Sequence, residues 1–110
     1  MAGRSSQAKG RRAEMELAEL LRQAGFPSVR AGDALSYGRW PDVAGLPGLH
    51  IECKRHERLE LGAWMRQAVE DAGRFGGLPA VFHRQNRQGW LVSMRLADWL
   101  NLYERAIKHE

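Results

Sequence analysis

The stretch LHIECKR at residues 49–55 is the feature that most constrains the fold of this chain. Successive side chains of a β-strand point to opposite faces, and in this stretch apolar and polar residues alternate. The odd-numbered residues from Leu49 to Cys53 therefore face a hydrophobic core. The opposite face carries His50, Glu52 and Lys54. A fold built on this strand must cover its apolar face and also accommodate a carboxylate beside an ammonium group.

The residues before this strand predict an antiparallel hairpin. The segments PDVAG and LHIECKR flank GLPG, whose glycines and proline are typical turn residues. With the turn centred on GLPG, the hairpin brings Asp42 opposite residues 51 and 52, where side chains on paired strands are close neighbours. We therefore expect the carboxylates of Asp42 and Glu52 to converge.

Three segments have apolar residues at intervals of three and four, which is the period of an amphipathic helix. The first runs from about Arg11 to Ala24 and ends at AGFP, because glycine caps helices and proline prevents their continuation. The second lies in LELGAWMRQAVEDAGRF and ends before GGLP. The apolar face of the third carries Leu96, Trp99, Leu100, Tyr103 and Ile107. We assign Trp64, Trp90 and Trp99 to the core.

The remaining segments predict short strands. Residues 28–40 lack a helical period and contain glycine breaks, which indicates a short strand followed by a mobile loop. Two further strands, at about residues 80–84 and 90–93, flank the polar turn QNRQG. The predicted order is α-β-β-β-α-β-β-α. The fold class is therefore α/β, with a mixed central β-sheet flanked by helices.

A chain of 110 residues should form one domain. We expect this domain over residues 11–110, preceded by a flexible basic arm over residues 1–10, which are rich in Ser, Gly and Ala. The chain has no apolar run as long as a membrane span, and its start lacks the apolar segment of a signal peptide. Its single cysteine cannot form an internal disulfide. These features predict an intracellular, cytoplasmic protein that does not bind membranes.

The formal net charge of +4 and the sequence pI of about 9.8 favour a polyanionic partner. Residues 1–12, the arm with the two residues after it, contain no acidic residue and carry Arg4, Lys9, Arg11 and Arg12. Such an arm is suited to contacts with phosphates. The alternative is a frayed terminus that only adds solubility. Arg39, Arg55 and Arg58 flank the predicted hairpin and, with Arg84 and Arg87, would form a basic rim around it.

Two carboxylates that converge repel each other unless a proton or a cation lies between them. Oxygen ligands with open water positions suit Mg²⁺, and Mn²⁺ should substitute for it. Such an ion activates water and neutralises charge on a phosphoryl group, and Lys54 is placed to orient the attacking water. Asp42, Glu52 and Lys54 therefore predict phosphodiester hydrolysis. The alternative is a surface salt bridge between Lys54 and Glu52 or Asp42, which would contribute about 1 kcal/mol or less.

Glu14 is a candidate third carboxylate. On the first predicted helix it lies in line with Leu17 and Leu21 at the edge of the apolar stripe, whereas Glu16 and Glu19 are expected to face solvent. A carboxylate turned towards a core needs a partner.

These motifs resemble the PD-(D/E)XK nuclease superfamily: PDV supplies the first motif through Asp42, and ECK supplies the second through Glu52 and Lys54. The segment KGRRAEMELAELLRQAGF is similar to the first helix of archaeal Holliday-junction resolvases and of related small phage nucleases. HRQNRQGWLVSMRLADWL is similar to the tail of small phage-encoded members. The resemblance runs from about Lys9 to Tyr103, and the loop from Ala31 to Arg39 departs from it.

The resemblance implies a restriction-endonuclease-like core and a Mg²⁺-dependent DNA endonuclease. The expected catalytic residues are Glu14, Asp42, Glu52, Lys54 and Gln67, and the expected metal ligands are Asp42, Glu52, Glu14 and the backbone carbonyl of Cys53. Gln67 would touch the site or the substrate backbone, or else face solvent. The resemblance also implies branched DNA, such as a four-way junction, as substrate, in a bacterium or a phage-infected host. It suggests a homodimer whose interface would use Trp99 and Tyr103.

Other classes of site find less support. His50 and Cys53 point to opposite faces of one strand, and the paired spacings of zinc sites are missing. No GxxxxGK[ST] loop is present, so no nucleotide cofactor is predicted. Trp40 is suited either to stacking on a base or to packing beneath the loop. Two functional alternatives stay open: a non-catalytic DNA-binding or assembly module that keeps the nuclease fold, and a nuclease directed at RNA.

Overall fold

The computed structural model describes residues 2–32 and 41–109, with side chains from residue 10 onward. The elements are α1 (Ala2–Gln23), β1 (Arg30–Ala31), β2 (Val43–Ala44), β3 (Leu49–Arg55), α2 (Leu61–Phe75), β4 (Leu78–Arg84), β5 (Leu91–Ser93) and α3 (Leu96–Lys108). Their order confirms the predicted order of helices and strands. Arg39 and Trp40 lie outside the described residues.

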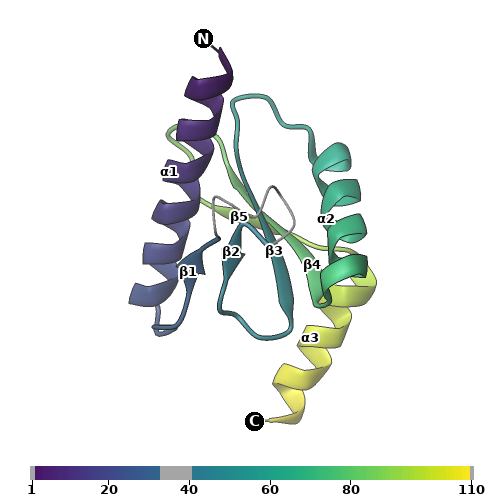
Figure 1. The fold of residues 1–110 in the computed structure, drawn as a ribbon. Helices are drawn as coiled ribbons and strands as arrows, with labels where there is room; N and C mark the ends of the chain where they lie inside the picture. Colours follow the sequence, from purple (N-terminus) through teal and green to yellow (C-terminus); the bar gives the residue numbers. More distant parts are fainter. Residues whose placement is uncertain (1, 33–40, 110) are drawn as a thin grey trace.

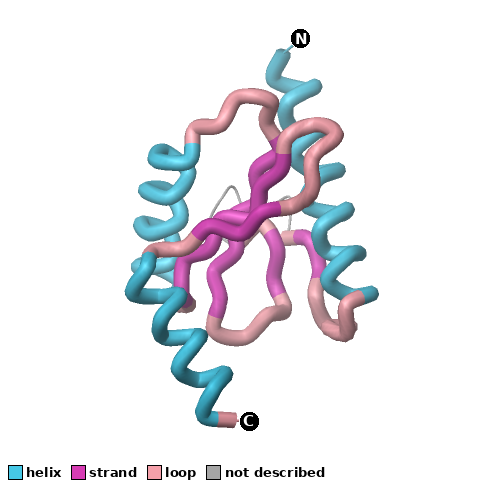
Figure 2. The backbone as a smooth tube through the Cα atoms, turned by 180° about the vertical axis from the view of Figure 1, so that it is seen from behind, coloured by secondary structure: helices cyan, strands magenta, loops and turns pink. Residues whose placement is uncertain are grey.

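The five strands form one mixed sheet in the order β1-β2-β3-β4-β5. Only β3 and β4 are parallel, and α2 makes the crossover between them. The other neighbours pair antiparallel, including the predicted β4–β5 hairpin. Helices α1 and α2 lie on opposite sides of the sheet, as both views show (Figures 1 and 2). The predicted α/β fold with flanking helices is confirmed.

The core is divided between the two faces of the sheet. The larger cluster lies beneath α1 and consists of Ala13, Leu17, Ala18, Val29, Val43, Ile51, Cys53, Ala80 and Phe82. A smaller cluster beneath α2 contains Trp64, Ala68 and Val81. Because both faces of the central strands are covered, the polar face of β3 is buried as well: His50 is 2% and Glu52 3% exposed. Glu52 of LHIECKR therefore lies inside the molecule, whereas Lys54 and Arg55 at the end of the strand are partly exposed.

The backbone of residues 2–10 continues helix α1 back to Ala2, and the flexible basic arm over residues 1–10 stays a prediction. One expectation from the sequence is wrong: Trp99, expected in the core, is 49% exposed. The physical reason is that α1 and α2 already occupy the two sides of the sheet, so α3 extends beyond it (Figure 1). Trp64 is buried as expected, and Trp90 is partly buried against the larger cluster.

None of the helices in the described part of the chain combines the length and the apolar content needed to cross a membrane.

The β2–β3 hairpin depends on a close backbone approach at Gly45. Gly45 has φ +108°, and a Cβ there would lie 2.5 Å from the carbonyl oxygen of Ser28 and 2.7 Å from Cα of Val29. Gly48 in the same turn has φ +88°, but a Cβ there would meet no atom within 4 Å. Both glycines adopt a backbone conformation that other residues rarely adopt. Only Gly45 also excludes a side chain by contact.

We predict that Gly45→Ala destabilises the protein more than Gly48→Ala. Both substitutions incur the conformational cost of a positive φ, about 1–2 kcal/mol. Gly45→Ala adds a backbone clash that costs about 1–3 kcal/mol more. Urea unfolding followed by tryptophan fluorescence measures both free energies of unfolding. Equal losses in the two variants would show that the contact with residues 28 and 29 does not constrain the hairpin.

Candidate active site

The candidate site lies at the edge of β3, where the pairing with β2 ends. Val43 pairs with Ile51, and the N–H of Asp42 donates to the carbonyl of Ile51 at 2.9 Å. Beyond this point the side chain of Asp42 takes the place of a strand: its Oδ2 accepts a hydrogen bond of 2.7 Å from the N–H of Cys53. The hairpin thus brings Asp42 to Glu52 and Cys53, as predicted.

This hydrogen bond also orients the carbonyl of Cys53. In a strand, the N–H and C=O of one residue point towards the same neighbouring strand. The N–H of Cys53 points towards Asp42, so its carbonyl is directed to the same open edge. One carbonyl oxygen and the Asp42 carboxylate therefore face the same space, which is the arrangement expected of two oxygen ligands.

Glu14 reaches this edge from α1. Its side chain is 21% exposed and lies 3.7 Å from the Arg11 guanidinium, measured from Oε2 to Nη1. Burial and then the negative charge of Asp42 raise the pKa of Glu14 to about 7, although Arg11 and Lys54 act in the opposite direction. Glu14 is therefore the partly buried carboxylate that the helical pattern predicted, and it faces Asp42.

Glu52 is the most deeply buried carboxyl of the group. Burial, followed by the charge of Asp42 and hydrogen bonds with Asp42 and Asp71, raises its pKa to about 9. Its Oε1 lies 3.1 Å from Nε2 of His50. Burial lowers the pKa of His50 below its ordinary value, which favours the neutral imidazole. Near neutral pH, Glu52 keeps a proton unless a cation replaces it.

Lys54 points to Gln67 rather than to a carboxylate. Its Nζ donates to Oε1 of Gln67 at 3.1 Å, and within the described ranges it forms no ion pair with Asp42 or Glu52. The alternative of a cross-strand salt bridge is therefore wrong. Gln67 is exposed but contacts the site through Lys54, so both readings of this residue are partly right.

The polar contacts between α2 and β3 follow from matched spacing. Four residues advance a helix by about 6.0 Å and two residues advance a strand by about 6.6 Å. Gln67 contacts Lys54, Asp71 contacts Glu52, and the Phe75 ring stacks 6.4 Å from His50. We did not select Asp71 or His50 as site residues from the sequence. They could have been identified from the spacing of the two elements: residues 67, 71 and 75 of the helix lie opposite residues 54, 52 and 50 of the strand.

A cavity of about 410 Å³ opens beside this group. It is lined by Gly10, Glu14, Asp42, Cys53, Lys54, Arg55, His56 and Glu57. Three of the expected metal-binding residues and Lys54 thus line one opening beside the middle of α1, the start of β2 and the end of β3. Glu52 is not among the lining residues because it is buried.

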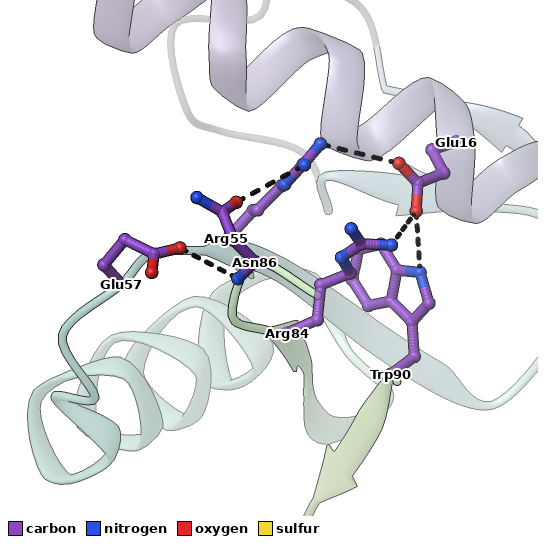
Figure 3. A network of polar contacts seen from close by, with 6 residues as sticks. All are labelled: Glu16, Arg55, Glu57, Arg84, Asn86 and Trp90. Carbon is purple, nitrogen blue, oxygen red and sulfur yellow. Dashed lines mark hydrogen bonds and ion pairs between the residues drawn. The ribbon is translucent and has the colours of Figure 1, made fainter. Parts of the chain in front are cut away.

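A network of polar contacts holds two arginines beside the cavity (Figure 3). Arg55 and Arg84 are neighbours in the parallel β3–β4 register, and Glu16 of α1 contacts both, at 3.6 Å and 2.7 Å. The same Glu16 carboxylate accepts a hydrogen bond of 3.1 Å from the indole N–H of Trp90. Glu16 was expected to face solvent, and this is wrong, because the two paired strand ends bring like charges together and require a carboxylate between them.

The other predicted DNA-binding residues are dispersed. Arg11 is partly buried and bonds the carbonyl of Gly32, and Arg12 is exposed. Arg58 is highly exposed, with Glu60 at 4.0 Å. The side chains of Arg4 and Lys9 lie outside the described residues, as does Arg39.

The donor set fits a divalent cation. Asp42 interacts with both Glu14 and Glu52 and shares the open edge with a backbone carbonyl, Glu14 and Glu52 have raised pKa values, and hard cations prefer oxygen ligands. Within the described ranges, Lys54 is not neutralised by an ion pair. A site of this kind can bind a cation, hold a water molecule and place a cationic side chain beside a phosphoryl group.

Comparison with known proteins also indicates a nuclease. The family described as phage putative PDDEXK endonuclease matches residues 5–109. The chain is also similar to the solved structure of Hjc from Archaeoglobus fulgidus, a Holliday junction resolvase from an archaeal hyperthermophile. The identity is 29%, the match covers 76% of this chain and 70% of that chain, and the TM-score is 0.57. None of the curated proteins matches the sequence.

The family match spans nearly the whole described chain, including PD at residues 41–42 and ECK at residues 52–54, and Asp42 and Glu52 of these two motifs meet at the edge of β3. The chain belongs to the phage PDDEXK endonuclease family, and so to the PD-(D/E)XK nuclease superfamily.

Proposed function

We propose that this protein is a Mg²⁺-dependent endodeoxyribonuclease that cuts branched DNA. The observation that carries the proposal is the position of Asp42, which faces both Glu14 and Glu52 and lies beside the Cys53 carbonyl at one open strand edge. Nearby, Lys54 bonds Gln67 and has no ion pair among the residues that the structure describes. An isolated structural ion pair would instead neutralise Lys54 against a carboxylate.

Asp42, Glu52, Glu14 and the carbonyl of Cys53 are the proposed metal ligands. When bound, Mg²⁺ or Mn²⁺ supplies charge neutralisation at the phosphoryl group and lowers the pKa of a water molecule. Lys54 Nζ orients the attacking water and stabilises the negative charge that develops on the phosphoryl oxygens. Gln67 positions Lys54, since its Oε1 accepts one of the three ammonium hydrogens. A P–O bond to the water oxygen then forms as one phosphodiester P–O bond breaks; the attacking water gives up a proton to solvent, and the leaving oxygen takes up a proton from solvent.

DNA as the substrate is supported by the family and by the charge of the surface around the cavity. Arg4, Lys9, Arg11 and Arg12 belong to α1, whose residue Gly10 lines the cavity, so the proposed phosphate contacts come from a helix rather than from a loose arm. Arg55 ends the catalytic strand and Arg58 follows it, and we place Arg39 with them. Contacts of this type bind phosphates with little dependence on sequence and weaken with salt.

Selectivity for branched DNA rests on the similarity to the archaeal resolvase. A four-way junction requires cuts in two strands, and a homodimer presents two sites. The proposed interface is the apolar face of α3, where Trp99 and Tyr103 stack with ring centroids 5.2 Å apart and are 49% and 50% exposed. The protein is proposed to act inside the cell, where such DNA lies.

We predict that purified protein with Mg²⁺ or Mn²⁺ cleaves a labelled four-way junction in a gel assay. Asp42→Asn removes a ligand and Lys54→Ala removes the group that orients water, so each variant should cleave at least about 100-fold more slowly. Glu70→Gln is the matched control for Asp42→Asn, because Glu70 pairs with Arg74 in the open, with both side chains 66% exposed. This control should cleave at the wild-type rate.

The substrates in the same assay separate the alternatives. Symmetric nicking of the junction alone would establish a resolvase, whereas cutting of linear duplex and single strands as well would indicate a general nuclease. Cutting of RNA but not DNA would support the RNA-directed alternative. Binding without cutting would favour the non-catalytic module. Unchanged cleavage by Asp42→Asn would show that the assigned metal site is wrong.

We predict that without divalent cations the protein becomes less stable as pH rises. The folded state holds the proton of Glu52 up to a pKa of about 9, because burial, and then the charge of Asp42 and hydrogen bonds with Asp42 and Asp71, disfavour its ionisation, whereas the unfolded chain releases it near 4.5. The unfolded state therefore binds fewer protons, and the free energy of unfolding falls with pH. Glu14 contributes in the same direction up to about pH 7, so the slope between about pH 7 and 9 belongs to Glu52.

Glu52→Gln imitates the protonated carboxyl and should flatten this slope. At pH 8 the variant should be more stable than the wild type by about 1–3 kcal/mol. Urea unfolding in EDTA at several pH values measures the effect, and Glu70→Gln should keep the wild-type slope. If Glu52→Gln also kept that slope, Glu52 would not be the group that holds the proton.

We predict that Trp99→Asp weakens the dimer, because it places a charge in the centre of the apolar face. Asn101→Asp adds the same charge to the same helix, but about 160° around the axis from residue 99 at 100° per residue. It should leave the dimer intact. Light scattering with size-exclusion chromatography measures the mass of each variant. A monomeric wild type at all concentrations, or an equal effect of the two substitutions, would contradict an interface at Trp99.

A further inference from the structure

His50, Glu52 and Asp71 form a second group of metal-ligand side chains on the α2 side of β3. Their nearest ligand atoms all lie within 4.8 Å of one another. The group shares Glu52 with the proposed Mg²⁺ site but draws its other two members from different positions. His50 lies two residues earlier on β3, and Asp71 comes from α2.

The fold places these groups rigidly. His50 is 2% and Glu52 3% exposed, and both lie on a strand paired along its whole length with β4. Asp71 is partly buried and follows Ala68, which is fully buried, on the inner side of α2. Because helix and strand spacing match, Asp71 is held opposite Glu52 in the same way that Gln67 is held opposite Lys54.

The distances suit direct coordination. Nitrogen and oxygen ligands bind a transition-metal ion at about 2.1 Å, so two adjacent ligands lie about 3.0–3.4 Å apart. The Nε2 of His50 and Oε1 of Glu52 are 3.1 Å apart. Small rotations of the partly exposed Asp71 carboxylate would bring the third ligand atom from within 4.8 Å to this range.

The charges require a positive partner on this side too. Glu52 hydrogen-bonds with both Asp42 and Asp71, so it lies between two other carboxyl groups. Asp71 has no lysine or arginine partner among the residues that the structure describes, although it is partly buried. A cation at the Asp42 edge leaves Asp71 without compensation. Like charges held this close favour either shared protons or a bound cation.

We propose that Glu52 bridges two cation positions, and that the second, formed with His50 and Asp71, binds a divalent transition-metal ion. An imidazole nitrogen together with carboxylates favours an ion of the Mn²⁺ class over Mg²⁺, which prefers oxygen ligands alone. This inference rests on the proposed function, because it assumes that Glu52 is also a ligand of the first position. The second ion lies away from the cavity opening and fixes the Glu52 carboxylate in its bridging orientation.

The test is Mn²⁺ binding to the full chain without DNA, measured by the number of bound ions and by pulsed electron paramagnetic resonance. Wild-type protein should bind two Mn²⁺ ions and show coupling to an imidazole ¹⁴N nucleus. His50→Gln should lose this coupling and one ion. Asp71→Asn should weaken the binding of the second ion at least about tenfold. This variant keeps the shape of a partly exposed side chain, so it tests the site if His50→Gln does not fold.

His56→Gln is the matched control, because His56 lines the cavity and is the other histidine beside the first position. It should keep both ions and the ¹⁴N coupling. The proposal is overturned if the wild type shows no ¹⁴N coupling, if His56→Gln removes the coupling, or if Asp71→Asn leaves the second ion unchanged. In each of these failures the wild type would still bind the ion that Asp42→Asn removes. If instead the proposed function is wrong, Asp42→Asn would remove no ion from the protein.

Discussion

The hydrogen bond from the N–H of Cys53 to the Asp42 carboxylate is the interaction on which the site depends. Strand β2 ends after two residues, so the edge of β3 would otherwise present an unpaired donor. The Asp42 side chain satisfies that donor and closes the hairpin at the same time. It also leaves the carbonyl of Cys53 directed at the open edge. A structural need of the sheet therefore places two oxygen atoms where a cation can reach them.

The parallel pairing of β3 and β4 explains why Glu52 is buried. A parallel pair requires a crossover, and here the crossover helix α2 covers the face of β3 opposite to α1. A carboxyl group under a helix loses water, and its pKa rises to about 9. The same helix provides Gln67 and Asp71, so a shift of α2 would move the partners of Lys54 and Glu52 together.

The sequence was sufficient to predict the order of elements, the hairpin, the approach of Asp42 to Glu52 and the partly buried position of Glu14, because local periodicity and one turn determine them. It was not sufficient for Glu16, whose partners Arg84 and Trp90 lie 68 and 74 residues away and meet it only through the sheet. Asp71 was missed because its role depends on how α2 lies against β3. The exposure of α3 was missed because helical periodicity shows an apolar face without showing whether the sheet has room for it.

The raised pKa values of the carboxyl groups in the site link the stability of the fold to metal binding. Desolvation and mutual repulsion raise the pKa values of Glu14 and Glu52 to about 7 and about 9, so the folded protein without metal must either hold protons or tolerate repulsion. Each unit of raised pKa corresponds to about 1.4 kcal/mol of unfavourable interaction in the charged form. A divalent cation removes this repulsion only in the folded state, because the unfolded chain does not bring Asp42 and Glu52 together. The groups that weaken the metal-free fold at high pH are therefore those that give the site its affinity for cations.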